Sequence, residues 1–302
     1  MSDLMDASRN FKSGFVAIVG APNVGKSTLL NRMLGEKVSI TSKKPQTTRN
    51  RILGILHRPE AQLIFIDTPG VHQASRALNV RIVEAALLAL DDVDLILAVS
   101  DVSRPDPVSE ELLFKRLAEQ KHPVVLALNK IDLVDKNRLL AIIDTWNRRH
   151  DFKEIVPISA SRGTQVDSLI GVMERLMPAG PPLFPEDSLT DVPERFLVGE
   201  IIREKAFRLT GQELPYSVAV TVDSFSEENR QKQVTIHATL HVERPSQKAI
   251  IIGKNGAKLK QIGQDARKDI ERLLGTRVFL KLFVRVQKNW SRDTRALRRF
   301  GY

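Results

Sequence analysis

Between residues 14 and 177, short apolar runs alternate with stretches in which apolar residues recur every three or four positions. Continuous apolar runs are typical of strands covered on both faces, and their alternation with amphipathic helices is typical of α/β domains. This part of the chain therefore predicts a mostly parallel six-stranded sheet, with ligands bound at the carboxyl ends of its strands. The predicted strands are 15–19, 51–56, 63–66, 94–100, 124–129 and 155–158.

Residues 178–193 interrupt this pattern, since they contain five of the chain's 15 prolines. Proline clusters favour extended, semi-rigid spacers, so we place a linker here, after a tail over 1–13 and a first domain over 14–177. The second domain, 194–302, is predicted as α+β in the order helix, strand, strand, helix, helix, strand. Its expected elements are 194–209, 216–225, 233–242, 246–252, 257–274 and 277–286.

A glycine-rich segment lies between the first predicted strand and the helix that follows it. Residues 20–27 read G-A-P-N-V-G-K-S, and this strand–loop–helix context is the one that a G-x-x-x-x-G-K-S phosphate loop requires. Its backbone N–H groups and the helix N-terminus favour bound phosphate, Lys26 supplies a charge for the β- and γ-phosphates, and Ser27 a hydroxyl for Mg²⁺. The predicted contacts are Gly20, Ala21, Pro22, Asn23, Val24, Gly25, Lys26, Ser27 and Thr28.

A D-x-x-G motif follows the predicted strand 63–66 and comprises Asp67, Thr68, Pro69 and Gly70; these four residues and Val71 are predicted nucleotide contacts. Its aspartate can hold Mg²⁺ through water, and the glycine N–H can meet the γ-phosphate. Alone, such a motif is more often a turn than a site, but a phosphate loop upstream favours the functional interpretation.

The motif that selects the base ends the predicted strand 124–129 and comprises Asn129, Lys130, Ile131 and Asp132. The Asp132 carboxylate can accept hydrogen bonds from N1–H and the exocyclic amine of guanine, whereas adenine offers neither. An unpaired buried polar group costs about 1–3 kcal/mol, which predicts GTP rather than ATP. Ser159 and Ala160 follow the last strand; they can place a backbone N–H at the guanine carbonyl, or they form an ordinary helix N-cap.

The polar segment 41–49 lacks periodicity and fits a loop that the γ-phosphate and Mg²⁺ order before hydrolysis. A threonine hydroxyl is the usual Mg²⁺ ligand of such a loop; we choose Thr48, with Thr47 as its competitor. The expected metal ligands are thus Ser27, Thr48 and Asp67. The alternative is a solvated loop with neither role.

The net charge of +10 is concentrated at one end of the chain. From Lys248 to Tyr302 there are 15 lysines and arginines against four acidic residues, so the rest is close to neutral. This distribution favours a polyanionic partner, nucleic acid first and an anionic membrane surface second. The absence of cysteine fits a reducing cytosol, and we expect neither a signal peptide nor a membrane-spanning segment.

Within this basic end, G-K-N-G joins two predicted helices after an apolar run. A lone G-x-x-G is more often a turn, but this one lies in the most basic part of the chain, and I-I-G-K-N-G resembles the loop of a type II KH domain. That resemblance implies RNA contacts at Gly253, Lys254, Asn255, Gly256, Lys258 and Lys260. The small number of aromatic residues argues against binding dominated by base stacking.

Together these motifs resemble those of the Era family of bacterial ribosome-assembly GTPases. The resemblance rests on G-x-P-N-V-G-K-S-T-L-L-N, on S-x-K-P-Q-T-T-R, on the three motifs after strands, and on I-I-G-K-N-G in an αββααβ order, which is similar to a type II KH domain. It implies a P-loop GTPase that uses GTP/GDP and Mg²⁺ and binds single-stranded 16S rRNA near its 3′ end. It also implies a role in 16S rRNA processing and 30S subunit biogenesis, a largely monomeric state and a cytoplasmic location with peripheral contact at the inner membrane.

One departure from the Ras-type pattern concerns hydrolysis. Val71 occupies the position where Ras-type enzymes carry a water-orienting glutamine, so slow intrinsic turnover is expected. In some relatives an asparagine matching Asn23 helps to hold K⁺ beside the phosphates, which makes K⁺ a candidate cofactor here. The expected catalytic residues are Lys26, Thr48, Gly70 and Asn23.

Two rival functions follow from the same features. One is a passive RNA-binding protein in which GTP serves stability only, and the other is a GTPase that uses its basic end on anionic lipid. An RNA affinity that is the same with GTP and with GDP would favour the first function. Vesicle binding that is stronger than RNA binding would favour the second. A nucleotide kinase is disfavoured, because no acceptor site is visible.

Overall fold

The computed structural model describes residues 11–41, 52–68, 70, 92–210, 218–228 and 233–300. The chain divides into two compact units. The first comprises Met1–Ser39 and Thr48–Asp191, and the second comprises Ile40–Thr47 and Val192–Tyr302. Among the described residues, no helix has the length and apolar character that crossing a membrane requires.

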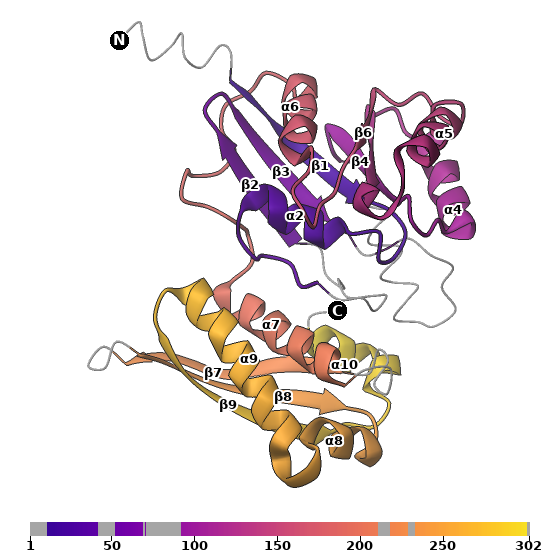
Figure 1. Cartoon of the computed structure of the whole chain (residues 1–302). Coiled ribbons are helices and arrows are strands. Elements are labelled where there is room, and N and C mark those ends of the chain that lie inside the picture. Colours follow the sequence, from indigo (N-terminus) through magenta and orange to yellow (C-terminus); the bar gives the residue numbers. More distant parts are fainter. Residues whose placement is uncertain are drawn as a thin grey trace, which may run out of the picture. The chain divides into compact units, whose positions relative to one another are not determined.

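The first unit contains a six-stranded sheet in the order β2-β3-β1-β4-β5-β6 (Figure 1). All pairs are parallel except β2 with β3, which are antiparallel. The predicted mostly parallel sheet is therefore confirmed, with boundaries shifted by a few residues. The strands are β1 (Lys12–Val19), β2 (Ile52–Arg58), β3 (Ala61–Asp67), β4 (Leu95–Asp101), β5 (Val124–Asn129) and β6 (Glu154–Pro157).

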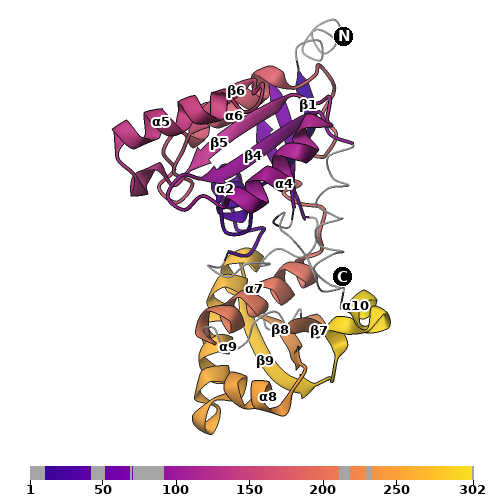
Figure 2. The same cartoon turned by 90° about the vertical axis from the view of Figure 1, so that its right-hand side faces the viewer.

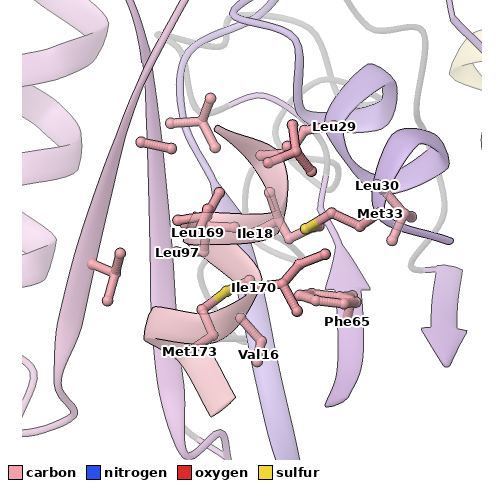
Figure 3. Close-up of a cluster of buried hydrophobic side chains, with 14 of the residues drawn as sticks. Val16, Ile18, Leu29, Leu30, Met33, Phe65, Leu97, Leu169, Ile170 and Met173 are labelled. Atoms are coloured by element: carbon pink, nitrogen blue, oxygen red, sulfur yellow. The ribbon is translucent and has the colours of Figure 1, made fainter. Parts of the chain in front are cut away.

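Helices cover both faces of this sheet (Figures 1 and 2). One face packs against α2 (Lys26–Leu34) and α6 (Val166–Leu176), and the other against α4 (Pro107–Ala118) and α5 (Lys136–Asn147). Because successive strand residues point to opposite faces, β1 contributes to both cores. The α2/α6 core, shown in Figure 3, contains Val16, Ile18, Leu29, Leu30, Met33, Phe65, Leu97, Leu169, Ile170 and Met173. These apolar runs explain why the strands were predictable.

Strand register brings the carboxyl ends of the central strands together. Ile18, near the end of β1, lies opposite Asp67 of β3, and Asp101 of β4 lies opposite Asn129 of β5. The residues that follow these strands therefore converge on one edge of the sheet.

The proline-rich segment is held along the first unit, not suspended as a free spacer. Near its start, the Gly180 N–H donates to the Phe11 carbonyl at 3.0 Å. Near its end, the Leu189 carbonyl accepts from the Ile55 N–H at 2.9 Å, and the Asp191 carboxylate accepts from the Leu53 N–H at 3.2 Å. The boundary between the units accordingly falls after Asp191, close to the end of the predicted linker. At the other end of the first unit, β1 begins at Lys12, inside the predicted tail.

The second unit has a three-stranded sheet in the order β7-β8-β9, with β7 antiparallel and β9 parallel to β8. Helices α7 and α9 pack on one of its faces, as Figures 1 and 2 show. The predicted αββααβ order is confirmed, and a short helix α10 (Thr294–Arg299) follows it. The elements are α7 (Glu194–Leu209), β7 (Ala219–Glu228), β8 (Gln233–Val242), α8 (Pro245–Ile252), α9 (Ala257–Leu274) and β9 (Arg277–Val286).

Candidate functional sites

The glycine-rich segment connects the end of β1 at Val19 to the start of α2 at Lys26. Within it, Asn23 adopts a left-handed backbone conformation with φ 64°, and its side chain is exposed. The N-cap of α2 is Gly25, so the first free N–H groups of the helix lie beside the loop. The strand–loop–helix context on which the phosphate-binding hypothesis depends is therefore present.

The Lys26 side chain is buried and folds back over this loop. Its Nζ donates hydrogen bonds to the carbonyls of Gly20 at 2.9 Å and Ala21 at 3.0 Å. Burial lowers the pKa of the Lys26 ammonium from 10.5 to about 8, while the nearby Asp67 carboxylate opposes this shift. The charge is thus held in place by backbone carbonyls and lies close to a carboxylate.

Asp67, the last residue of β3, gathers hydroxyl groups around one carboxylate oxygen. Its Oδ2 accepts from the Ser27 hydroxyl at 2.9 Å and from the Ser39 hydroxyl at 2.7 Å. Hydroxyl and carboxylate oxygens are the ligands that Mg²⁺ prefers, so this set fits the ion predicted from Ser27 and Asp67.

Ser39 was not anticipated, because nothing in the local sequence distinguishes it. Asn31 of α2 fixes its position: the Asn31 amide donates to the Ser39 carbonyl at 2.7 Å and accepts from its N–H at 3.0 Å. The chain just before the segment 41–49, which is predicted to respond to the γ-phosphate, is thereby anchored to the phosphate-loop helix.

The D-x-x-G motif lies against the phosphate loop. The Thr68 hydroxyl donates to the Ile18 carbonyl at 2.7 Å. At Gly70, an added Cβ would stand 2.8 Å from Pro22 Cα, so only glycine permits this approach. Four residues with predicted roles at this site, Thr47, Thr48, Pro69 and Val71, lie outside the described residues.

Asn129 connects the phosphate loop to the loop after β6. Its Nδ2 donates to the Val24 carbonyl at 2.7 Å, and its Oδ1 accepts from the Ala160 N–H at 3.0 Å and the Lys130 N–H at 2.8 Å. The N–H predicted at the guanine carbonyl therefore donates to Asn129 here, and the guanine contact stays a prediction. Nearby, Arg32 of α2 donates to the Ser161 carbonyl at 2.5 Å, a tie that the sequence did not reveal.

Lys130 also contacts the phosphate loop. Its Nζ donates to the Asn23 carbonyl at 2.8 Å and forms an ion pair with the buried carboxylate of Asp101. Asp101 was not predicted, although one signal was available: it ends an apolar strand at the same edge of the sheet as Asn129.

The Asp132 carboxylate is oriented by two partners from the loop after β6. Its Oδ1 accepts from the Ser159 hydroxyl at 2.7 Å, and its Oδ2 lies 3.4 Å from Arg162 Nε. Ser159 therefore positions the proposed base-recognition carboxylate through its side chain, in addition to the backbone role predicted for it. Ile131 begins the one-turn 3-10 helix that carries this carboxylate.

In the second unit, the G-x-x-G loop joins α8 to α9 by a tight turn. Gly253, Asn255 and Gly256 all have φ between 51° and 77°. Lys254 and Asn255 are exposed, as is Lys260 in the first turn of α9, whereas Lys258 is half-buried. The loop thus presents its backbone and a cationic side chain to solvent.

Two family models match the chain at these sites. One described as a 50S ribosome-binding GTPase matches residues 15–130, and one described as a KH domain matches residues 213–291. The GTPase Era of Geobacter metallireducens is 56% identical over 292 residues, covering 97% of this chain and 98% of that protein. This chain belongs to the Era family of GTPases. The Era of Syntrophus aciditrophicus is 49% identical, covering 97% of this chain and 95% of that protein.

Solved Era structures share both units. An Aquifex aeolicus Era variant bound to GDP·AlF₄⁻ has a TM-score of 0.93 and 43% identity, and covers 97% of this chain and 99% of that one. An Era in complex with MgGDPNP and nucleotides 1506–1542 of 16S ribosomal RNA matches with the same values. The P-loop GTPase fold, the KH fold and the family assignment are therefore established for this chain.

Proposed function

We propose that this GTPase binds Mg²⁺·GTP between the phosphate loop and Asn129–Asp132, hydrolyses it to GDP and phosphate, and binds single-stranded 16S rRNA through its KH unit. The observation that carries this proposal is the hydrogen-bonded convergence of the phosphate loop, Asp67, Asn129 and Asp132 at one edge of the sheet. The solved Era bound to MgGDPNP and 16S rRNA supports it.

Each group of the nucleotide has a distinct partner in this proposal. The backbone of residues 20–28 and the Lys26 ammonium bind the phosphates, and the Gly70 N–H meets the γ-phosphate. Ser27, Asp67 and Thr48 would hold Mg²⁺, which when bound neutralises charge on the β- and γ-phosphate oxygens. Since phosphoryl transfer needs positioning and charge stabilisation above all, these residues supply most of what the chemistry requires.

Asp132 confers guanine specificity, because its carboxylate accepts from the two donors that distinguish guanine from adenine. The Ser159 hydroxyl and Arg162 hold that carboxylate in one orientation. Isothermal calorimetry with GTP and ATP tests this assignment directly. Comparable affinities for the two nucleotides would contradict it.

A monovalent cation beside the phosphates is the proposed replacement for a water-orienting glutamine. Asn23 is suited to this role, since its side chain is exposed while its carbonyl is fixed by Lys130. We expect GTP hydrolysis to be faster in K⁺ than in Na⁺ at equal ionic strength, and Asn23→Ala to remove the difference. Equal rates in the two salts would reject the role.

For RNA, the proposed contacts are the loop Gly253–Gly256 with Lys258 and Lys260. KH loops of this kind clamp the backbone of about four nucleotides. Maturation of the 30S subunit is the proposed setting, with the protein acting as a cytoplasmic monomer and making peripheral contact with the inner membrane. The concentration of positive charge after Lys248 supports a polyanionic partner but does not by itself choose between RNA and lipid.

A short stretch of chain supports control of the RNA-binding unit by the nucleotide. Thr41, which groups with the second unit, donates its N–H to Glu204 Oε2 of α7 at 3.3 Å, and Arg208 donates to its hydroxyl at 3.1 Å. Two residues earlier, Ser39 contacts Asp67 of the nucleotide site. These hydrogen bonds and the chain from Ser39 to Thr41 therefore form a short path from the proposed Mg²⁺ ligand Asp67 to α7.

Lys254→Glu tests the RNA assignment better than a glycine substitution. A Cβ at Gly253 would lie 2.7 Å from Lys258 Cβ, so a side chain there would distort the loop itself, whereas Lys254 is exposed. We expect Lys254→Glu to weaken binding of a 16S 3′-end RNA about tenfold or more at 0.1 M salt. Lys115→Glu, an equal charge change at an exposed position of α4, is the matched control. Equal losses in both variants would contradict the assignment.

A further inference from the structure

The sheet of the KH unit has a second face that no helix of α7–α9 covers. Strand register defines it: Phe279, Lys281 and Phe283 of β9 lie beside Thr235, His237 and Thr239 of β8. The intervening residues, such as Val278 and Ile236, belong to the buried core under α7 and α9. We call the six residues Phe279, Lys281, Phe283, Thr235, His237 and Thr239 the outer platform.

Two exposed aromatic rings distinguish this face. Phe279 is 52% exposed and Phe283 is 44% exposed, and among the described residues they are the two aromatic members of the exposed large hydrophobic set. Exposing two such rings on one strand is unfavourable unless a partner covers them.

The surroundings of Phe283 are those of a stacking site. The Lys281 Nζ lies 5.3 Å from the centre of its ring, and the His237 ring meets it edge-on at 6.3 Å and 84°. Beside these two groups, which can bind phosphate or a base edge, Phe283 keeps 44% of its surface exposed. Such pairing of aromatic faces with cations is typical of single-stranded nucleic-acid sites.

Charge complementarity selects the occupant. The outward row of β9 reads Arg277, Phe279, Lys281, Phe283, Arg285, and all five side chains are exposed. The carboxylate of Asp223, at the β-bulge of β7, contacts the outer platform on the β7 side of β8, where it accepts from Thr239 and from Thr221 of β7. A row with cations between and outside its aromatic rings suits a polyanion whose bases are unstacked.

The chain itself closes one end of this face. Beside Arg285, the His241 ring lies 4.6 Å from the ring of Phe300, which in turn packs against the buried Trp290. The open part therefore extends along β9 from Arg277 to Phe283.

We infer that the outer platform is a second binding surface for single-stranded RNA, separate from the Gly253–Gly256 loop, which joins helices that pack on the sheet's other face. The rings of Phe279 and Phe283 are four residues apart on a strand, about 13 Å, so each takes a separate, splayed base. Lys281 and the flanking arginines contact the phosphates. This inference depends on the proposed RNA binding of the KH unit and extends it to a longer RNA.

Photo-crosslinking tests this surface without any substitution. The full chain, loaded with a non-hydrolysable GTP analogue, is irradiated with a single-stranded RNA of the 16S 3′ region, and the crosslinked tryptic peptides are identified by mass spectrometry. Trypsin places Phe279 and Phe283 in separate peptides, 278–281 and 282–285. Crosslinks on both peptides support the inference. Crosslinks confined to residues 253–260 overturn it and leave the loop assignment intact.

Substitutions then separate stacking from general hydrophobicity. Phe279→Leu/Phe283→Leu is expected to weaken binding of the long RNA tenfold or more, and the Tyr/Tyr variant to retain it, because only the latter keeps the rings. An RNA of about five nucleotides, which the loop alone can hold, should bind equally to all three proteins. Thermal unfolding midpoints verify folding, and Leu140→Ser on α5 is the exposed apolar control.

The outcomes distinguish this inference from the function on which it rests. Unchanged long-RNA affinity in the Leu/Leu variant overturns the outer platform while RNA binding stands. Absence of RNA binding in the unsubstituted chain overturns both. Loss of binding to phosphatidylglycerol vesicles, with long-RNA affinity unchanged, assigns the rings to lipid and likewise overturns the inference.

Discussion

Asp132 is the single residue whose replacement has the most specific expected outcome. In Asp132→Asn, the side chain keeps one acceptor for guanine N1–H but turns a donor toward the exocyclic amine, which is itself a donor. We expect GTP affinity to fall at least about 100-fold. Xanthosine triphosphate, which has a carbonyl in place of that amine, should bind the variant better than GTP does.

Calorimetry with the two nucleotides measures this switch. Asp187→Asn, a change at an exposed position of the first unit, is the matched control and should leave GTP binding as it was. A variant that still prefers GTP would show that another group reads the base.

Lys26 gives the site a pH dependence whose sign follows from its lowered pKa of about 8. Above that pH the free protein loses the ammonium, and bound phosphate restores it, so GTP binding should take up a proton and weaken as the pH rises through 8. In the unfolded chain the lysine titrates near 10.5. Between these values the unfolded state holds more protons, and this residue's contribution to the free energy of unfolding therefore rises with pH.

Calorimetry in two buffers of different ionisation enthalpy measures the linkage. The number of protons that Lys26 takes up when GTP binds should be close to zero at pH 7. It should increase toward one proton per nucleotide above pH 8. A value that stays near zero at pH 8.5 would mean that the lysine is charged throughout.

At the scale of elements, Asn129 is the link between three loops. Asn129→Ala removes the partners of the Val24 carbonyl and of the Ala160 and Lys130 N–H groups. Leaving such groups unsatisfied should lower the free energy of unfolding by about 2–4 kcal/mol. Urea unfolding measures the loss, and Asn147→Ala at the exposed end of α5 should change the same quantity by less than about 0.5 kcal/mol.

The segment after α6 is a second element with a testable role. Leu189 and Asp191 accept hydrogen bonds from Ile55 and Leu53 of β2, an edge strand of the sheet. Covering an edge satisfies its backbone and prevents pairing with other chains. A fragment ending at Asp191 should therefore melt at a higher temperature than one ending at Met177, and aggregate less. Equal melting temperatures would show that the segment contributes nothing to the first unit.

Over the whole molecule, the features that could be predicted from the sequence are those that depend on neighbouring residues in the chain. Strands β1 to β6 could be predicted because they contain apolar runs. Helix α9 could be predicted because its apolar positions repeat at helical spacing. The motifs after the strands could be predicted because the residue spacing within each motif is fixed by the nucleotide group that it contacts.

What the sequence did not reveal depends on residues far apart in the chain. Ser39 meets Asp67, and Lys130 meets Asp101, only because the sheet brings separate strand ends together. The scarcity of aromatic residues argued against stacking, yet strand register places Phe279 and Phe283 together on an open face. Exposure, unlike composition, is a property of the folded unit.

We propose that the nucleotide bound by the first unit controls RNA binding by the second. The most direct test of this control is the affinity of the full chain for a single-stranded 16S 3′-end RNA, measured with a non-hydrolysable GTP analogue and with GDP, with an ATP analogue as the control. We expect tighter RNA binding with the GTP analogue than with GDP, and no effect of the ATP analogue. Equal RNA affinity in all three nucleotides would contradict it.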